Sequence, residues 1–208
     1  MTSDSITLYT HPQSRGRTAR WALEETGLPY AVELLGYGTS MKSPEYLAIN
    51  PMGKVPALVH GDAMVTEVAA IGLYLADLVP EKRLAPQAGT AERGAYYRWI
   101  SFMAPLEQLM MAKHVGQLGD PMSAGYGTEA DLLRTLESAI GEREHLVGDG
   151  FTMADLLVAA NLGFFLQFGM LEPRDAFVRF AKLHHSRPAA QRAAAADDAA
   201  AKALESGR

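Results

Sequence analysis

The first eighty residues alternate short apolar runs typical of strands with longer patterns typical of helices. Strand-like runs cover residues 5–10 and 30–35, and a helical pattern covers residues 14–27 between them. Strand, helix and strand in this order form a βαβ unit, in which the two strands are parallel and the crossover is right-handed. The chain is therefore predicted to open with a parallel strand pair.

A second group of elements follows in the same region. The runs 56–59 and 63–65 are separated only by the turn HGD, and a helical pattern covers 66–78. Strands joined by so short a turn form an antiparallel hairpin. Residues 1–80 are therefore predicted to form an α/β domain, a mixed four-stranded sheet with helices on its faces.

The pattern changes after residue 80. The segment 79–92 contains two prolines and a glycine between apolar helices, which is typical of a linker. After it, apolar side chains recur at intervals of three and four residues, the period of a buried helical stripe. The first stripe consists of Trp99, Phe102, Met103, Leu106, Leu109 and Met110. Similar stripes over 128–147, 153–168 and 174–186 predict an all-helical domain over 92–208.

Two segments of this helical domain have a more specific signature. Thr152 and Asp155 have the spacing of a capping box at the start of a helix, and the helix that follows is apolar nearly all round. That helix is predicted to be central, and the capping box to be a folding device. The alanine-rich end of the chain, 187–208, has few large side chains to bury and is predicted to be a surface helix that frays.

Composition and charge narrow the functional classes. The 208 residues are 48% hydrophobic and 21% charged, which is ordinary for a soluble globular protein. No run of about 18 apolar residues is present, and the start MTSDSITLYT lacks the basic and apolar regions of a signal peptide. A cytoplasmic location without a membrane partner is expected. The formal charge of −5 argues against a nucleic-acid partner.

The sequence limits which side chains could bind a metal or attack an electrophile. The chain has no cysteine, so a disulfide, a thiolate metal site and a cysteine nucleophile are all excluded. His184 and His185 are adjacent and cannot share one helix face, so they lack metal-ligand spacing. No metal site is predicted, and any sulfur chemistry must come from a ligand.

The segment NPMGKVPALV, residues 50–59, places Pro56 at the start of a predicted strand. Because proline has no N–H, it belongs at the first residue of a strand, at an edge or at a bulge. One interpretation is an ordinary loop proline. The other is a cis Val55–Pro56 bond in a turn that leaves the Val55 N–H and C=O facing outward, ready to pair with a bound peptide.

These features together resemble the cytosolic glutathione transferases over nearly the whole chain. The resemblance depends on the mixed sheet, on NPMGKVPAL, on TEVAAI at the start of the next helix, and on the T-x-x-D of the helical domain. It implies a thioredoxin-like domain over 1–80 that binds glutathione as co-substrate and a helical domain over 92–208 with a pocket for the second substrate. In that family the proline is cis, and the residue before it, here Val55, pairs its backbone with the cysteinyl unit.

The resemblance also assigns the two ends of the tripeptide. Glu67 lies in the first turn of a predicted helix, where the dipole favours a carboxylate with or without a ligand. By resemblance, Glu67 takes the γ-glutamyl amine and the Val68 N–H takes the adjoining carboxylate. Many relatives have serine at position 68, so that hydroxyl contact is lost here. Lys54 pairs with the glycyl carboxylate or is a solvated loop charge.

The group that activates the thiol has several candidates. In several classes of the family a hydroxyl or thiol near the end of the first strand lies beside the sulfur, and Tyr9, Thr10 and Ser14 occur there, next to Arg15. Alignment on the serine-using classes selects Ser14, whereas alignment on the cysteine-bearing bacterial class selects Arg15. Instead of activating the thiol, Tyr9 could point into the core, and Ser14 could be the N-cap of the helix.

The second-substrate pocket is the least specific prediction. Methionines in such a stripe, here Met103, Met110 and Met111, are core residues in most proteins. Together with Tyr97 and His114, which lie on the same predicted helix, they are also suited to an adaptable apolar pocket.

The resemblance implies attack of the glutathione thiolate on small apolar electrophiles, the reaction of a glutathione S-transferase. Two alternatives use the same fold: a glutathione-binding or protein-interaction module without turnover, and a glutathione-dependent isomerase or dehalogenase. The resemblance further implies a two-fold symmetric homodimer that uses the helices at 66–78 and 92–118.

Overall fold

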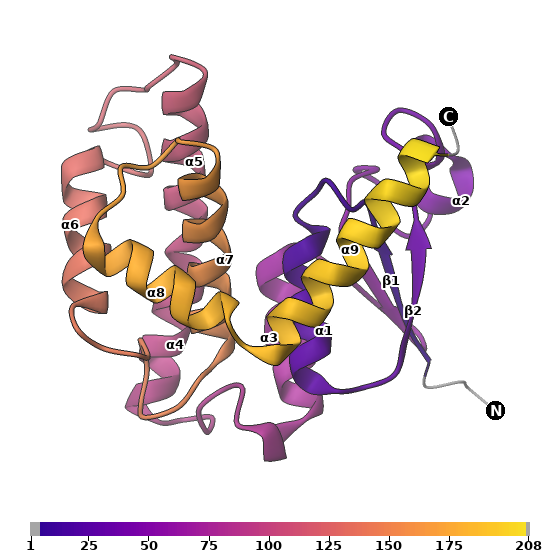
Figure 1. The fold of residues 1–208 in the computed structure, drawn as a ribbon, viewed down its shortest axis with the longest axis horizontal. Helices are drawn as coiled ribbons and strands as arrows, with labels where there is room; N and C mark the ends of the chain where they lie inside the picture. The colour runs from indigo at the N-terminus through magenta and orange to yellow at the C-terminus, as the bar shows by residue number, and fades with distance from the viewer. Residues whose placement is uncertain (1–4, 207–208) are drawn as a thin grey trace. The chain divides into compact units, whose positions relative to one another are not determined.

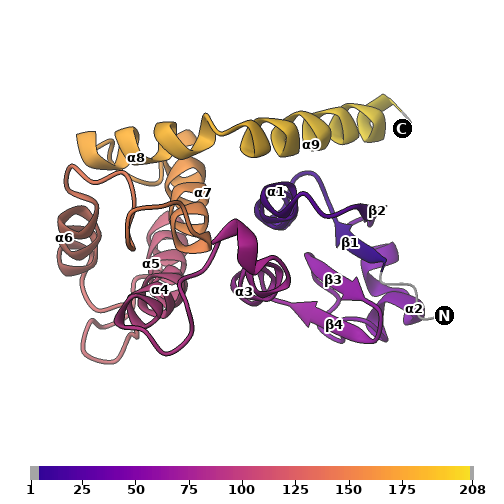
Figure 2. The same ribbon diagram turned by 90° about the horizontal axis from the view of Figure 1, so that it is seen from below.

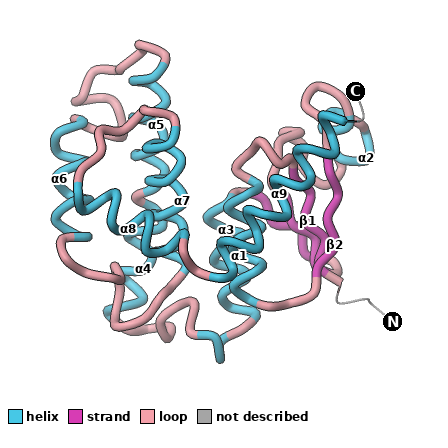
Figure 3. The backbone as a smooth tube through the Cα atoms, viewed as in Figure 1, coloured by secondary structure: helices cyan, strands magenta, loops and turns pink. Residues whose placement is uncertain are grey.

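The computed structural model of the chain describes residues 5–206. Their contacts divide the chain into two compact units, one containing the residues up to Lys82 together with those from Arg187 onward, and the other containing Arg83–Ser186. Figure 3 shows strands only in the first unit.

The first unit contains the predicted mixed sheet of four strands. The strands are β1 (Ile6–Thr10), β2 (Tyr30–Leu34), β3 (Ala57–His60) and β4 (Ala63–Thr66), in the order β2-β1-β3-β4. β1 is parallel to β2, whereas the pairs β1–β3 and β3–β4 are antiparallel. The predicted thioredoxin-like topology is confirmed.

The helices of this unit lie on both faces of the sheet. They are α1 (Gly16–Thr26), the 3₁₀ helix η1 (Ser40–Lys42), α2 (Pro44–Leu47), α3 (Val68–Leu78), the 3₁₀ helix η2 (Pro80–Lys82) and α9 (Pro188–Ser206). Figure 2 shows α1 and α3 on one face and α2 on the other. Ile6 and Leu8 of β1 are buried, as is the Ala19–Leu23 segment of α1, so α1 and the sheet share one core.

The position of α9 differs from the prediction of a fraying helix within a domain over 92–208. α9 packs along α1 in the first unit, as Figures 1 and 2 both show. Ala189, Ala190 and Ala193 are buried. Small side chains allow two helices to approach closely, and ion pairs join their sides, including a buried one between Arg20 and Asp197 at 3.0 Å. Small residues and ion pairs hold α9 against α1, so this contact does not require large apolar side chains in α9.

The second unit contains helices and loops and no strand among its described residues. Its helices are α4 (Ala91–Ser101), α5 (Met103–His114), α6 (Glu129–Ile140), α7 (Met153–Gln167) and α8 (Asp175–His185). α7 contacts α4, α5 and α8 and is buried over most of its length, as its all-round apolar pattern predicted. The helix expected to continue through 92–118 is instead interrupted at Phe102, which separates α4 from α5, and α5 ends at His114.

The predicted capping box is present at the start of α7. The Thr152 backbone N–H and side-chain hydroxyl both donate to Asp155 Oδ2, at 2.8 and 3.0 Å. Asp155 Oδ1 accepts a further hydrogen bond from the Leu146 N–H at 2.7 Å. Asp155 therefore fixes both the start of α7 and the loop that precedes it.

Within residues 5–206, the structure contains no helix that combines the length and the apolar character needed to cross a membrane.

Candidate functional site

The residues predicted to bind glutathione meet at one edge of the sheet. Tyr9 lies opposite Ala57, and Ala57 lies opposite Thr66, so the end of β1, the start of β3 and the end of β4 are neighbours. The loops 11–15 and 53–56 and the start of α3 adjoin these three ends (Figure 2). This edge is called the Val55 edge below.

Two buried side chains hold the loop that precedes Val55. The Tyr46 hydroxyl and Asn50 Nδ2 both donate to the Lys54 carbonyl, the second at 2.8 Å, and Asn50 Oδ1 accepts from the Met52 N–H at 3.1 Å. Burial raises the pKa of Tyr46, which keeps its hydroxyl protonated as a donor. Neither residue was predicted to act at this site, although Asn50 opens the NPMG turn and asparagine is favoured at such positions.

Val55 has an anchored side chain and an unpaired backbone. The Val55–Pro56 bond is cis, and the Val55 side chain packs against the cluster of Met41, Tyr46 and Ala57. Within residues 5–206, neither the Val55 N–H nor its C=O has a hydrogen-bond partner. An adjacent free donor and acceptor at the start of a strand are suited to pair with an extended peptide.

Glu67 adopts a rare backbone conformation at the start of α3. Its φ is 68° and its ψ is 124°, and it is the N-cap residue of the helix rather than a member of the predicted first turn. A positive φ is uncommon for residues other than glycine, and such strained residues cluster at ligand-binding positions. The exposed Glu67 carboxylate lies beside the helix N-terminus, and the first turn contains no acidic residue, so an anion can approach its N–H groups.

Ser14 is engaged in local hydrogen bonds. Its hydroxyl donates to the His11 carbonyl at 2.6 Å and accepts from the Gly16 N–H at 2.9 Å. The helix begins at Gly16, two residues later than predicted, and Arg15 occupies the N-cap position without a side-chain cap. Ser14 thus satisfies an N–H group at the helix start, which is the alternative role given by the sequence. Donation to a thiolate requires its hydroxyl to rotate away from His11.

Thr10 is enclosed beneath the same helix start. Its side chain is fully buried, and its hydroxyl has no hydrogen-bond partner among the described residues. A Cβ at position 16 would lie 1.8 Å from Thr10 Oγ1, so only glycine fits there. The close approach of Gly16 to Thr10 places the first turn of α1 directly over the end of β1.

The other candidates for thiol activation lie in different surroundings. Tyr9 packs against the Met41 cluster, with its ring centroid 5.6 Å from that of Tyr46. Arg15 is half-buried at the N-cap of α1. Arg17 of α1 forms an ion pair with Asp198 at 2.8 Å, and this pair partly offsets its charge.

Two lysines approach the Val55 loop. Lys54 is exposed, in keeping with either of its predicted roles. Lys42 Nζ donates to the Met52 carbonyl at 3.0 Å and was not predicted, because nothing in its sequence neighbourhood links it to this loop. The loop therefore has two cations that an anionic group of a ligand can use.

The five residues predicted to line a second-substrate pocket separate into two groups. Met103 and Met110 are 5% and 0% exposed and belong to the helical core, the alternative that the sequence analysis gave for the methionines. Tyr97 and Met111 are 45% and 46% exposed, and His114 is also exposed. The break at Phe102 places Tyr97 on α4 and His114 on α5, so they do not share a helix as predicted.

Comparison with known proteins agrees with this fold. The family described as "Glutathione S-transferase, N-terminal domain" matches residues 4–77. Glutathione S-transferase F10 of Arabidopsis thaliana is 30% identical over 166 residues, which cover 73% of this chain and 76% of that protein. Glutathione S-transferase GST-4.5 of Xanthomonas campestris is 36% identical over 96 residues, which cover 46% of this chain and 47% of that protein. The match thus spans only about half the length of the Xanthomonas relative.

A solved structure is similar over a longer stretch. The glutathione transferase URE2P6 from Phanerochaete chrysosporium, in complex with oxidized glutathione, has a TM-score of 0.78 and 28% identity. The match covers 95% of this chain and 98% of that chain.

Proposed function

The chain belongs to the glutathione S-transferase family, and on that basis we propose that it binds glutathione at the Val55 edge and transfers its thiolate to small apolar electrophiles. The observation that carries the proposal is the unpaired N–H and C=O of Val55, held by Tyr46 and Asn50 at the start of β3. The cysteinyl backbone of glutathione is the complementary group, because one extended residue supplies one acceptor and one donor.

The remaining groups of the tripeptide fit the neighbouring residues. The Glu67 carboxylate takes the γ-glutamyl amine, and the N–H of Val68 at the start of α3 takes the adjoining carboxylate. Lys54 or Lys42 takes the glycyl carboxylate. Val68 provides no hydroxyl, so this end of the ligand is held by backbone and dipole alone.

The chemistry required of the protein is stabilisation of a thiolate. The glutathione thiol loses its proton to solvent, its sulfur forms a bond to the electrophilic carbon, and a halide leaves with the bonding electron pair. A free cysteine thiol has a pKa near 8.5, so most of it is protonated at neutral pH. The N-terminus of α1 and the Ser14 hydroxyl are the groups of this chain that favour the anion.

A second candidate function is glutathione binding without turnover. It is favoured by one observation, namely that the Ser14 hydroxyl already donates to the His11 carbonyl at 2.6 Å. If that bond persists in the complex, the thiol receives no hydroxyl hydrogen bond and its pKa stays close to its free value.

Binding and conjugation assays separate these possibilities. We expect the purified chain to be retained on immobilised glutathione and to conjugate glutathione with at least one member of a panel of aryl and alkyl halides. Retention without turnover across the panel would support the binding module. Absence of retention, with the fold intact by circular dichroism, would refute both functions. Glu67→Gln serves as the matched variant, because it keeps the size of the side chain but not the charge that pairs with the amine.

Ser14→Ala tests the activating group. A hydrogen bond to a charged group contributes about 1.5–3 kcal/mol and a pKa unit corresponds to about 1.4 kcal/mol, so Ser14 is expected to lower the pKa of the bound thiol by about one to two units. The lowered pKa increases the thiolate fraction most at pH values between the pKa of the bound thiol and that of the free thiol. Above the pKa of the free thiol it gives no advantage. Ser14→Ala should therefore reduce kcat/KM roughly tenfold near neutral pH, with a deficit that shrinks as the pH rises.

The direct measurement is the ultraviolet absorbance of the thiolate, titrated in the glutathione complexes of both proteins. Thr90→Ala is the control, because it removes a cap hydroxyl at the start of α4, in the other unit. That hydroxyl accepts a hydrogen bond from the Arg93 N–H. Coincident titration curves for Ser14→Ala and the parent would make Ser14 a helix cap only. Tyr9→Phe and Arg15→Ala are then the next variants to titrate.

A further inference from the structure

Three side chains that are distant in the sequence meet inside the helical unit. His145 lies in the loop between α6 and α7, Asp155 in the first turn of α7, and His184 in the last turn of α8. One nitrogen or oxygen atom from each lies within 4.8 Å of those of the other two. No metal site was predicted from the sequence, because His184 was considered only beside its neighbour His185.

His145 contributes a buried nitrogen that no protein group satisfies. Its Nδ1 is inaccessible to solvent and has no hydrogen-bond partner among the described residues. A buried polar atom without a partner is costly, and native proteins commonly resolve such cases with a bound water or ion. His145 Nδ1 is therefore a buried nitrogen without a protein partner among the described residues.

Asp155 contributes an oriented carboxylate. A carboxylate has about four acceptor positions, and three of them are used by the Leu146 N–H, the Thr152 N–H and the Thr152 hydroxyl. Oδ1 accepts only one of these bonds, from Leu146, and so retains a lone pair. Backbone donors that fix a ligating carboxylate are the usual outer support of a metal site.

His184 contributes an imidazole with a defined orientation. Its Nε2 lies 2.9 Å from the carbonyl oxygen of Glu144, and the rings of Phe151 and Phe180 pack against it with centroids at 5.3 and 4.4 Å. When Nε2 carries the proton and donates to that carbonyl, the lone pair of the neutral ring is on Nδ1. A backbone carbonyl in this position is the common partner of a metal-bound histidine.

We propose that His145, Asp155 and His184 bind a divalent transition-metal ion, for which Zn²⁺ is the best match. Two imidazole nitrogens and one carboxylate oxygen are donors that Zn²⁺ accepts, and a water completes a tetrahedron. Donors bound to Zn²⁺ at about 2.0–2.2 Å stand about 3.3 Å apart, so the His145 loop moves slightly inward when the ion binds.

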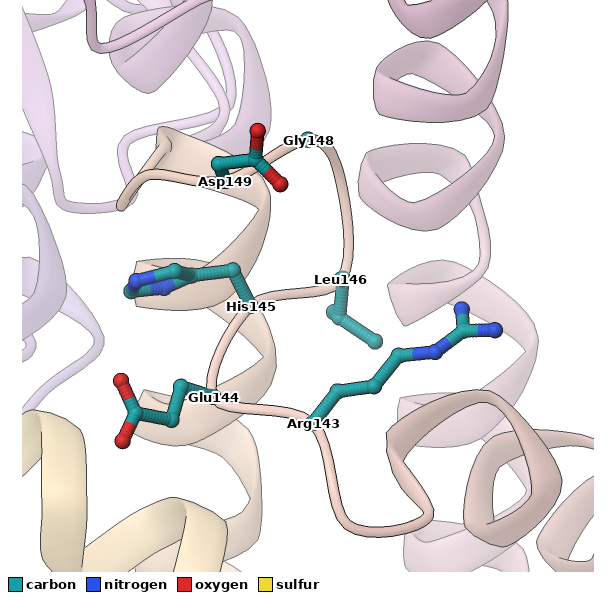
Figure 4. A pocket seen from close by; sticks show the side chains of 6 residues that line it. All are labelled: Arg143, Glu144, His145, Leu146, Gly148 and Asp149. Carbon is teal, nitrogen blue, oxygen red and sulfur yellow. The ribbon is translucent and has the colours of Figure 1, made fainter.

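His145 is the member of the cluster that lines a cavity at the protein surface. A surface cavity of about 440 Å³ is lined by residues of the 143–149 loop, including His145, Glu144 and Asp149. Figure 4 shows the His145 imidazole on this loop between the Asp149 and Glu144 side chains. The two carboxylates outnumber the one guanidinium, that of Arg143, among the lining residues, and this balance favours the approach of a cation.

The expected role of the ion is structural. It would connect the loop before α7 to the first turn of α7 and the last turn of α8. A ligand that binds only the folded chain stabilises it in proportion to the logarithm of its free concentration over its dissociation constant. Metal binding should therefore raise the unfolding temperature.

Calorimetric titration of Zn²⁺ into the full chain, freed of metal with a chelator and kept without glutathione, tests the proposal. We expect one equivalent to bind and the unfolding temperature to rise. His145→Gln should weaken binding at least tenfold and remove the thermal shift, because it deletes a ligand from a partly exposed loop. His114→Gln, at an exposed histidine of α5, should bind like the parent chain.

A second probe reports the coordination itself. Co²⁺ in a tetrahedral site absorbs strongly in the visible region, and this band should appear with the parent chain and with His114→Gln but not with His145→Gln. Absence of Zn²⁺ uptake by the parent, or equal affinity of His145→Gln and the parent, would overturn the proposal.

Discussion

Asp155→Ala should lower the free energy of unfolding by at least about 3 kcal/mol, because it removes the acceptor of three buried hydrogen bonds at once. Each donor left unsatisfied costs about 1–3 kcal/mol, and the side chain is fully buried, so water cannot replace the carboxylate. The loss affects the first turn of α7, the central helix of its unit. Urea denaturation, carried out with a chelator so that no metal contributes, measures the change.

Asp131→Ala is the matched control for this prediction. Thr128 and Asp131 repeat the T-x-x-D spacing at the start of α6, with the Asp131 N–H donating to Thr128 Oγ1 at 3.1 Å. The Asp131 side chain is 61% exposed, so water takes over its hydrogen bonds and the loss should stay below about 1 kcal/mol. Equal losses at the two positions would mean that the capping geometry, and not burial, determines the contribution of Asp155.

The two T-x-x-D segments show what the sequence could predict and what it could not. The local spacing predicts a capped helix start at Thr152 and is also present at Thr128. Burial is decided by what packs against each start, and that depends on chain segments far away. The parallel pair β1–β2 and the hairpin β3–β4 were predictable for the converse reason, since a βαβ unit and a tight hairpin are determined by neighbouring elements. The pairing of β1 with β3 was not, because it joins segments far apart in the chain.

The Val55 edge was predictable in part. The NPMGKVPAL segment and the acidic start of α3 singled out Val55 and Glu67, which adjoin the start of β3 and the end of β4 in the structure. Their role in binding glutathione stays a prediction. The hydrogen bonds of Tyr46 and Asn50 to the Lys54 carbonyl had no such signal, because only the fold brings these groups into contact. The cluster of His145, Asp155 and His184 likewise could not be predicted from the sequence, since its three members come from three separate segments of the fold.

Asp197→Ala should cost about 3–5 kcal/mol, because it leaves the buried Arg20 guanidinium without its partner. The Asp197 side chain is fully buried, and its oxygens accept no other hydrogen bond within residues 5–206. The contact fixes α9 against α1, so the variant should also expose α9 to proteolysis. Urea denaturation and limited proteolysis are the measurements.

The neighbouring residue provides the control. Asp198 pairs with Arg17 at 2.8 Å, but its side chain is 61% exposed, so Asp198→Ala should cost no more than about 1 kcal/mol. A double variant separates charge from packing: Arg20→Met combined with Asp197→Leu replaces the buried pair by apolar side chains and should recover most of the loss. A double variant as unstable as Asp197→Ala would show that the ion pair itself determines the docking of α9.

The pH dependence of stability gives an independent measure of the same carboxylate. Burial raises the pKa of Asp197 from an ordinary value of 3.8 to about 6, although Arg20 and Arg17 act in the opposite direction. Between these values the native chain retains a proton that the unfolded chain releases, so the free energy of unfolding falls as the pH rises through this window. This contribution is fully present below the unfolded value and absent above about pH 6. Asp197→Asn cannot ionise, so the parent should lose stability relative to Asp197→Asn across the window. A constant difference between the two proteins would mean that the Asp197 carboxyl has an ordinary pKa in the native chain.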